Sequence, residues 1–358
     1  MKSNSIRYIK TVAIGVFLAL LISFSLLIFY LMLTDYRPYE VEAVSVENSP
    51  QKAIDKQETI SLLTWNVGYA GLGKDESFFM DDGNKSKPDS LDVVKENLEG
   101  IQLTLEDEST DLVLLQEVDV NSNRTYHLDE KQFFEKKWAE FGSQFALNYK
   151  VKFVPVPFPP LGEIEAGQMT LSGFKIERGE RRALPGQYKW PKSLVMLDRC
   201  ALVSYLPIEG SDKYLVIINA HFSAYDDGRL RAAQMAYMKT YVESLYEQGD
   251  YVILGGDWNQ TFEFVDDSNF PLYMNGRFYM PHRIEPDWKP AGWKWGVAVN
   301  SPTYRLLNTA YEEGVTQVGI IDGFLVSPNV DIIATEVLDE GFEYSDHNPV
   351  KMTISLQF

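Results

Sequence analysis

Six polar motifs in this 358-residue sequence contain groups that bind metal ions or phosphate, and each stands beside an apolar run. They carry Asn66, Glu117, His221, Asp257 with Asn259, Asp322, and Asp346 with His347. Carboxylate and amide oxygens are ligands of hard divalent cations, and imidazole exchanges protons near neutral pH. A single motif of this kind is typical of a turn. However, the chain has only four histidines, and two of them lie here. The joint pattern therefore predicts one functional site.

The apolar runs beside these motifs are predicted strands of an alternating α/β unit. They cover residues 59–65, 111–117, 214–221, 251–259 and 318–322, and a last strand follows Pro349. Apolar residues at helical spacing predict a helix that begins after Pro88-Asp89-Ser90 and another over residues 229–248. Rigid scaffolds present functional groups where strands lead into loops. We therefore expect the motifs to converge in three dimensions.

The order of the motifs is informative as well. The chain contains, in this order, Thr64-Trp65-Asn66, Leu115-Gln116-Glu117, Asn219-Ala220-His221-Phe222, Gly255-Gly256-Asp257-Trp258-Asn259, Ile321-Asp322 and Ser345-Asp346-His347. This order resembles the endonuclease/exonuclease/phosphatase superfamily, which includes pancreatic-type deoxyribonucleases, abasic-site endonucleases, neutral sphingomyelinases and inositol-polyphosphate 5-phosphatases. The resemblance covers residues 59–358. It implies an α/β fold, a four-layered sandwich of two mixed β-sheets flanked by helices.

The resemblance also implies a phosphoester hydrolase that depends on a divalent metal, with Mg²⁺ as the expected cofactor and Mn²⁺ as an alternative. Such an ion neutralises the phosphate oxygens that repel a nucleophile. Glu117, Asn66 and Asp346 are expected as metal ligands, Asn66 through its amide oxygen. Asp257 is expected to take a proton from the attacking water and to hold this water in line with the leaving group. Asn259 would orient the water or donate to a phosphate oxygen.

The two histidines are expected to serve the transition state. His221 and His347 would be cationic donors to the phosphoryl oxygens, and one of them would protonate the leaving oxygen. Asp322 would hold the ring of His347 and raise its pKa. All matched positions carry a chemical group, which disfavours the alternative of a non-catalytic binding module on the same fold.

The N-terminal segment has the length and composition of a membrane span. Residues 12–33 carry no charge and would extend roughly 33 Å as a helix. A cleaved signal peptide is the alternative, but its apolar region is usually shorter and ends at small residues. Basic residues up to Lys10 precede the run, and Asp35 follows it. The positive-inside rule then predicts a cytoplasmic N-terminus.

We therefore expect four parts. Residues 1–10 form a cytoplasmic N-terminus, residues 11–34 a single transmembrane anchor, residues 35–58 a polar linker, and residues 59–358 a catalytic domain outside the cell membrane. The single cysteine, Cys200, excludes an internal disulfide and a cysteine-rich zinc site. A net charge of -18 argues against a sequence-independent nucleic-acid binder, because such proteins grip phosphates with excess cations.

Substrate contacts are expected in a locally basic stretch over residues 175–199, which includes Lys192, Arg199 and the aromatic Trp190. The stretch is either a solvated loop or a recognition loop for an anionic group. A tryptophan cluster at positions 288, 293 and 295 is open between core packing, base stacking and membrane contact.

Two substrate classes follow. One is a lipid head group or another small phosphoester, and the other is a nucleic acid cleaved by an anchored extracellular nuclease. The membrane is the one further partner that the sequence indicates, through the N-terminal helix. No protein partner can be inferred.

Overall fold

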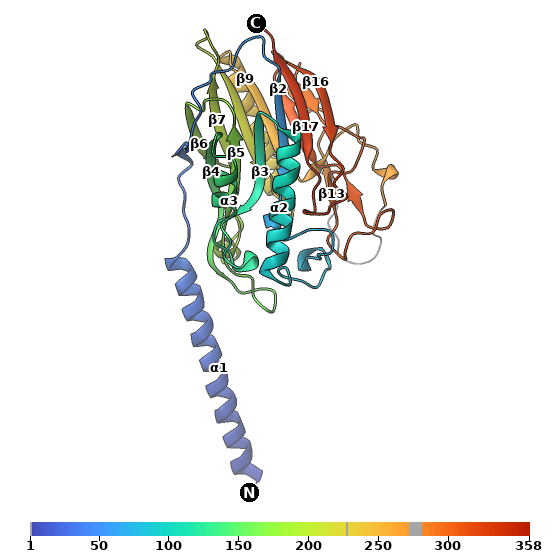
Figure 1. The fold of residues 1–358 in the computed structure, drawn as a ribbon. Helices are drawn as coiled ribbons and strands as arrows, with labels where there is room; N and C mark the ends of the chain where they lie inside the picture. Colours follow the sequence, from blue (N-terminus) through green and yellow to red (C-terminus); the bar gives the residue numbers. More distant parts are fainter. Residues whose placement is uncertain (1, 227, 272–280) are drawn as a thin grey trace.

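The computed structural model describes residues 2–226, 228–271 and 281–358. Its first element is the long helix α1, Lys2–Leu33, which projects from one end of the folded body (Figure 1). Within Ile6–Leu33, the most apolar 18-residue stretch has a mean hydropathy of 2.8, and none of it is buried. By length and composition this helix can cross a membrane, although a signal sequence meets the same criteria.

Two large mixed sheets make up the body in the described part of the chain. One has the order β16 (Val330–Val337), β17 (Val350–Leu356), β2 (Ile60–Asn66), β3 (Leu112–Asp119), β5 (Gly162–Ser172) and β4 (Gly142–Val154). The other has the order β1 (Val41–Val44), β6 (Arg178–Ala183), β7 (Cys200–Pro207), β8 (Tyr214–His221), β9 (Tyr251–Asp257), β15 (Asp322–Val326) and β12 (Lys294–Gly296). The pairs β2–β3 and β8–β9 are parallel, and the other pairs within these sheets are antiparallel.

The two sheets pack face to face over a shared apolar core. Leu62 and Leu114 from the first sheet lie in one buried cluster with Ile217 and Ile253 from the second. The central strands are buried over nearly their whole length, because helices also cover their outer faces. Continuous apolar runs are the sequence pattern of such strands.

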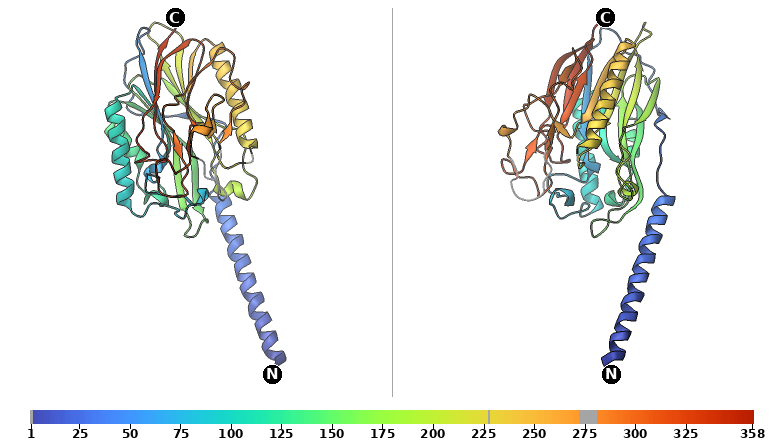
Figure 2. Two further views of the ribbon diagram at one scale, coloured as in Figure 1. Left: turned by 90° about the vertical axis from the view of Figure 1, so that its right-hand side faces the viewer. Right: turned by 180° about the vertical axis from the view of Figure 1, so that it is seen from behind.

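The helices complete the four layers. Figure 2 shows α2 (Leu91–Glu108) and α4 (Arg229–Glu247) on opposite outer faces of the sandwich. Ser90 caps α2 by accepting a hydrogen bond from the Val93 amide. Its apolar side, which includes Leu98 and Ile101, packs on the first sheet. This architecture confirms the expected four-layered sandwich.

Short elements connect these layers. They are α3 (Glu130–Lys137), β10 (Gln260–Thr261), β11 (His282–Arg283), β13 (Tyr304–Arg305), β14 (Val318–Gly319), and the 3₁₀ turns η1 (Gly68–Ala70), η2 (Phe79–Asp81), η3 (Asn123–Thr125), η4 (Lys192–Val195) and η5 (Asp267–Asn269). The single strand expected over residues 318–322 is in fact two. β14 pairs with β13, whereas β15 begins at Asp322 and pairs with β9.

Residues 35–58 differ from the polar linker that was expected. β1 extends the second sheet by pairing with β6, Glu47 bridges to Ser143, and Ile54 is fully buried beside Ile208. The segment therefore lies along the edges of both sheets. The apolar residues between Val41 and Val46 form only a short run flanked by polar residues, which explains why no strand was predicted here.

Candidate active site

The topology brings the ends of four strands together. Asn66 ends β2, His221 ends β8 and Asp257 ends β9, while Glu117 lies near the end of β3. His221 is directly opposite Asp257 in the parallel β8–β9 ladder. Asp322, the first residue of antiparallel β15, is opposite Asp257 on its other side. Parallel pairing puts the carboxyl ends of β2 and β3 at one edge of the first sheet, and those of β8 and β9 at one edge of the second. Because the two sheets pack face to face, these two edges lie next to each other.

Asp257 is the centre of the site. Its Oδ2 accepts a hydrogen bond from Asn66 Nδ2 at 3.1 Å and lies 3.1 Å from His221 Nε2 and 3.9 Å from His347 Nε2. Its Oδ1 accepts from the Asn259 amide at 2.8 Å. Burial and the charge of Asp322 raise the pKa of Asp257 to about 7, against the lowering effect of His347. The carboxyl group is therefore suited to exchange a proton near neutral pH.

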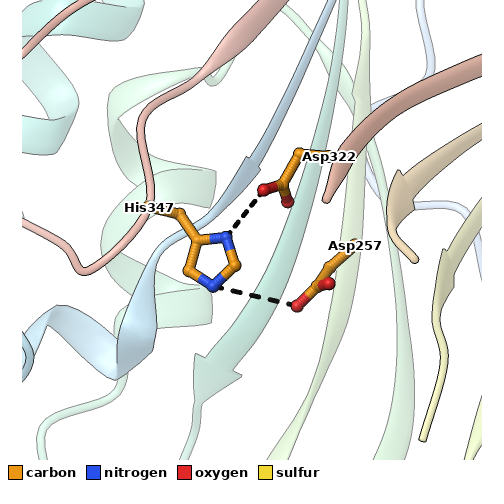
Figure 3. A group of neighbouring side chains, drawn as sticks. All are labelled: Asp257, Asp322 and His347. Atoms are coloured by element: carbon orange, nitrogen blue, oxygen red, sulfur yellow. Dashed lines mark hydrogen bonds and ion pairs between the residues drawn. The ribbon is translucent and has the colours of Figure 1, made fainter. Parts of the chain in front are cut away.

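His347 is held by a buried carboxylate. Figure 3 shows its Nδ1 facing Asp322 Oδ2, at 2.8 Å, and its Nε2 facing Asp257. Burial alone would lower the pKa of His347, but the charge and hydrogen bond of Asp322 outweigh it and raise this pKa to about 10. The ring is therefore an imidazolium with two N–H donors.

Asp257, Asp322 and His347 each offer one ligand atom, and these atoms lie within 4.8 Å of one another. Such a group can hold a metal ion when the imidazole is neutral. As an imidazolium, His347 has no lone pair to give to a metal. In that state Asp322 is hydrogen-bonded to His347, and the ring forms an ion pair with Asp257 at 3.9 Å.

His221 has the opposite charge state. Burial, together with the positive charges of Arg199 and His347, lowers its pKa well below the usual value. This direction favours a neutral His221, and the cationic role expected for it stays a prediction. Its Nε2 lies beside Asp257, whereas its Nδ1 is buried, lies 4.0 Å from Glu117 Oε1 and has no hydrogen-bond partner among the described residues.

Glu117 is placed by a β-bulge. The β3–β5 register shifts between Leu115 and Val118, and Glu117 adopts a left-handed φ of 57°. This conformation costs a non-glycine residue on the order of 1–3 kcal/mol. It turns the side chain out of the ladder, so that Oε1 lies 3.5 Å from Asn66 Nδ2. Backbone strain thus coincides with a predicted metal ligand.

Asp346 lies in a space that a glycine leaves free. A Cβ on Gly68, whose φ is +50°, would be 2.7 Å from Asp346 Oδ1. Burial raises the pKa of Asp346 to about 6, and nearby Glu117 adds to the rise, whereas His347 opposes it. Ser345 fixes the loop, since its Oγ donates to the Asn66 carbonyl at 2.7 Å.

The two amides make contacts within the protein that the sequence did not predict. Asn66 Oδ1 accepts from the Gly68 amide at 3.0 Å, and its Nδ2 faces Asp257 and Glu117. Asn66 thus presents a donor to the two carboxylates, and its role as an oxygen ligand of a metal stays a prediction. Asn259 has a φ of 50°, and its Nδ2 donates to the Phe222 carbonyl at 2.9 Å. It orients Asp257 through its backbone amide.

Two of the three predicted substrate contacts lie at the cavity, and the third does not. Lys192 and Arg199 line a cavity of about 320 Å³ that also reaches Glu117, His221 and Asp346. Arg199 Nη1 is buried and has no hydrogen-bond partner in the described part of the chain. Trp190 is 64% exposed and is not part of the cavity lining.

The remaining basic residues of this stretch are largely structural. Arg178 and Arg182 pair with Glu180 in β6, and Arg181 donates to the carbonyls of Leu147 and Asp198. The tryptophan cluster is core as well. Trp288, Trp293 and Trp295 belong to the apolar cluster around Trp258, and the cavity lining does not include them.

Sequence reasoning missed two groups that support the site. Arg124 pairs with buried Asp119 at 2.7 Å, stacks 3.6 Å above the Tyr69 ring and lines the cavity. Gln116 Nε2 donates to Asn219 Oδ1 at 2.8 Å and so joins β3 to β8 across the two sheets. Both side chains of the latter pair stand within the recognised motifs. Arg124 lies in the short turn η3, which no sequence pattern predicts.

Comparisons with known proteins agree with this geometry. The family model described as "Endonuclease/Exonuclease/phosphatase family" matches residues 63–347. An endonuclease/exonuclease/phosphatase from Beutenbergia cavernae has 17% sequence identity and a TM-score of 0.55, over 84% of this chain and 72% of that chain. One from Bacteroides vulgatus has 15% identity and a TM-score of 0.54, over 84% and 100%.

A third similar structure is D. rerio TDP2 complexed with single strand DNA product, with 17% identity and a TM-score of 0.51, over 83% of this chain and 99% of that chain. A search of curated proteins gave no match. These likenesses show a shared fold. Because the family model spans most of the folded body, the chain belongs to the endonuclease/exonuclease/phosphatase family.

Proposed function

We propose that this protein is a metal-dependent phosphoester hydrolase in which Asp257 activates water for in-line attack on phosphorus. The observation that carries the proposal is the environment of Asp257. Residues from three other parts of the chain, Asn66, His221 and His347, surround one of its oxygens. A buried carboxyl group with a pKa of about 7 can accept a proton from water near neutral pH.

The site also contains groups that fit a divalent cation. Glu117 and Asp346 are two carboxylates that line the same cavity. His221 Nδ1 faces Glu117 Oε1, and no hydrogen-bond donor among the described residues lies between them. Two acceptors that face each other in this way are unfavourable. Glu117 and Asp346 would hold the ion. When bound, Mg²⁺ or Mn²⁺ would neutralise phosphate oxygens and the developing charge on the leaving oxygen.

The residues of the chain would divide the hydrolysis as follows. Water adds to phosphorus, one of its protons passes to Asp257, and the bond from phosphorus to the leaving oxygen breaks. The leaving oxygen takes up a proton from solvent as it departs, and Asp257 then releases its proton to solvent. Asn66 and His221 hold the Asp257 carboxylate, while the His347 imidazolium, held by Asp322, donates to a phosphoryl oxygen. A diester thus gives a phosphate monoester and an alcohol.

A chromogenic phosphodiester tests this proposal. We expect the full chain to hydrolyse it with Mg²⁺ or Mn²⁺ and to lose activity in chelator. Asp257→Asn should lower kcat at least about 10²-fold, the low end for loss of a general base. Asp212→Asn, which changes an exposed aspartate, is the matched control. Activity that persists in chelator, or a near-normal kcat for Asp257→Asn, would refute the mechanism.

A nuclease is the second candidate, because the similar D. rerio TDP2 is named in complex with a single strand DNA product. The net charge of -18 weighs against it, since nucleic acids repel an acidic surface. A panel of plasmid DNA, RNA, phospholipids and sugar phosphates separates the two. Exclusive cleavage of nucleic acid would identify the hydrolase as a nuclease.

We also propose that α1 is a retained single-pass anchor, with residues 1–10 in the cytoplasm and the catalytic domain, residues 59–358, outside. The long apolar run and the basic residues before it support this topology. Protease added to intact cells should then digest the catalytic domain. Complete protection of the domain would reverse the topology, and a processed N-terminus would indicate a signal peptide.

A further inference from the structure

The cavity of about 320 Å³ connects the proposed catalytic centre with an apolar region. Glu117, His221 and Asp346 form part of its lining. Most of the remaining lining is hydrocarbon or aromatic, for example Val154, Leu161 and Ile164 from the β4–β5 hairpin. Such walls offer little to a sugar or a nucleic-acid backbone, which need polar partners, but they favour an alkyl chain.

The apolar walls of this cavity also support the end of α1. One buried cluster contains Tyr149, Val154 and Ile164 of the cavity lining together with Leu31 of α1, and Leu27 and Ile28 pack against it. The last turns of the apolar helix therefore contact the outer side of the cavity wall. In Figure 2 this end of α1 lies beside the loops at the end of the sandwich opposite the C-terminus.

The same end of the molecule exposes aromatic side chains. Phe158, between β4 and β5, is 97% exposed, and Trp190, just before η4, is 64% exposed. Both elements contact the cavity, since Val156 and Lys192 belong to its lining. Exposed aromatic residues of this kind favour the interface of a bilayer. With α1 in the membrane, these loops would face its surface.

A cation stands in the cavity with an open bonding position. Arg199 Nη1 is buried and has no hydrogen-bond partner among the described residues. A phosphate oxygen of a bound substrate would satisfy it. The cavity thus has an anion-binding group and acidic groups near the catalytic centre, and an apolar extension toward α1.

We infer that the substrate is a phosphoester with a single long alkyl chain, taken from the surface of the membrane that holds α1. Its phosphate would bind beside Arg199 and Asp257, and its chain would occupy the apolar part of the cavity. The volume lies at the low end of the range for ligand pockets, about 300–1,000 Å³, which suits one chain rather than two. This inference rests on the proposed hydrolase function.

A pair of chromogenic substrates isolates the role of the alkyl chain. The full-length protein in phosphatidylcholine nanodiscs is assayed with p-nitrophenyl methyl phosphate and p-nitrophenyl dodecyl phosphate, which share the reacting phosphorus and the leaving group. The kcat/KM ratio of dodecyl to methyl substrate should be at least about tenfold, because each buried methylene adds up to about fourfold. Val195→Trp, in η4, and Ala224→Trp, after β8, fill the cavity from different elements.

We expect either substitution to lower this ratio at least about tenfold, and the exposed Val299→Trp to leave it unchanged. Thermal unfolding identifies a variant that fails to fold, in which case the other decides. If both cavity variants keep a high kcat/KM ratio, the alkyl chain acts only by partition into the bilayer. That result would overturn the inference. A ratio near one in the unsubstituted protein would do the same. No hydrolysis of either substrate would refute the proposed function itself.

Discussion

His221 and His347 lie within 3.9 Å of the same Asp257 oxygen, yet their surroundings shift their pKa values in opposite directions. Asp322 holds a proton on His347, whereas burial and two cations remove one from His221. Two histidines at one carboxylate can therefore have different functions. His347 can donate to an anionic phosphoryl oxygen, while His221 positions Asp257 and offers an acceptor beside Glu117.

The hydrogen bond from His347 Nδ1 to Asp322 can be tested by substitution of Asp322. Asp322→Asn removes the negative charge that stabilises the imidazolium, and it leaves a side chain of similar shape in a fully buried position. We expect kcat for a phosphodiester to fall on the order of 10²-fold, the contribution of a positioned proton donor. KM should change far less. Asp212→Asn, at an exposed side chain, is the control, and an unchanged kcat would remove Asp322 from the mechanism.

The identities of these residues could be predicted from the sequence, but their states could not. Each motif shows that Asn66 or His221 follows an apolar run. Whether the Asn66 nitrogen or oxygen faces Asp257 depends on the Gly68 amide, which occupies its oxygen. Likewise, the charge of His221 depends on Arg199, which is adjacent only in the folded chain. The sequence records neither contact.

At the scale of elements, strained turns place the acidic groups. Glu117 and Asn259 both have positive φ, and Gly68 takes the same conformation two residues after the end of β2. The apolar runs predict where β2, β3, β8 and β9 end, because these strands are buried on both faces. The bulge in β3 leaves no such pattern. It is visible only in the register shift against β5.

Gly68 carries the sharpest prediction at this scale. Gly68→Ala adds a Cβ that would lie 2.7 Å from Asp346 Oδ1, so this carboxylate must move. The Mg²⁺ concentration for half-maximal activity should then rise at least about tenfold, the size of effect seen when metal ligands lose their support. Gly210→Ala is the matched control, since Gly210 also has positive φ but no atom within 4 Å of the added Cβ. Gly210→Ala should lower the free energy of unfolding by only about 1 kcal/mol, because alanine is less favourable than glycine at positive φ. Equal Mg²⁺ dependence in both variants would contradict the role of Asp346.

At the scale of the whole molecule, the catalytic edge, the apolar cavity and the end of α1 lie at one end of the sandwich. β17 leads from His347 toward the C-terminus at the opposite end (Figure 1). The sequence predicts both the apolar helix and the acidic site as separate features. It does not predict their proximity, because the β4–β5 hairpin and η4 connect them only in the folded chain. Residues 35–58 also strengthen this link by pairing with both sheets.

The junction between α1 and the body contains an aspartate whose ionisation opposes folding. Burial raises the pKa of Asp198 to about 6, and Asp35 at the end of α1 raises it further, whereas Arg181 lowers it. Because the folded state holds this proton more tightly than the unfolded chain, Asp198 costs stability above about pH 6. This cost declines as the pH falls toward about 4, the usual value for Asp.

Asp198→Asn should therefore raise the melting temperature by several degrees at pH 7.5 and change it little at pH 4. A change of about 1 kcal/mol moves Tm by roughly 2–4 °C in a domain of this order of size. Asp212→Asn, at a side chain that is 86% exposed, should leave Tm unchanged at both pH values. Scanning calorimetry of the full chain at the two pH values measures the difference. A stabilisation of equal size at both would show that the substitution acts through packing, and the carboxylate at the base of the helix would then carry no electrostatic cost.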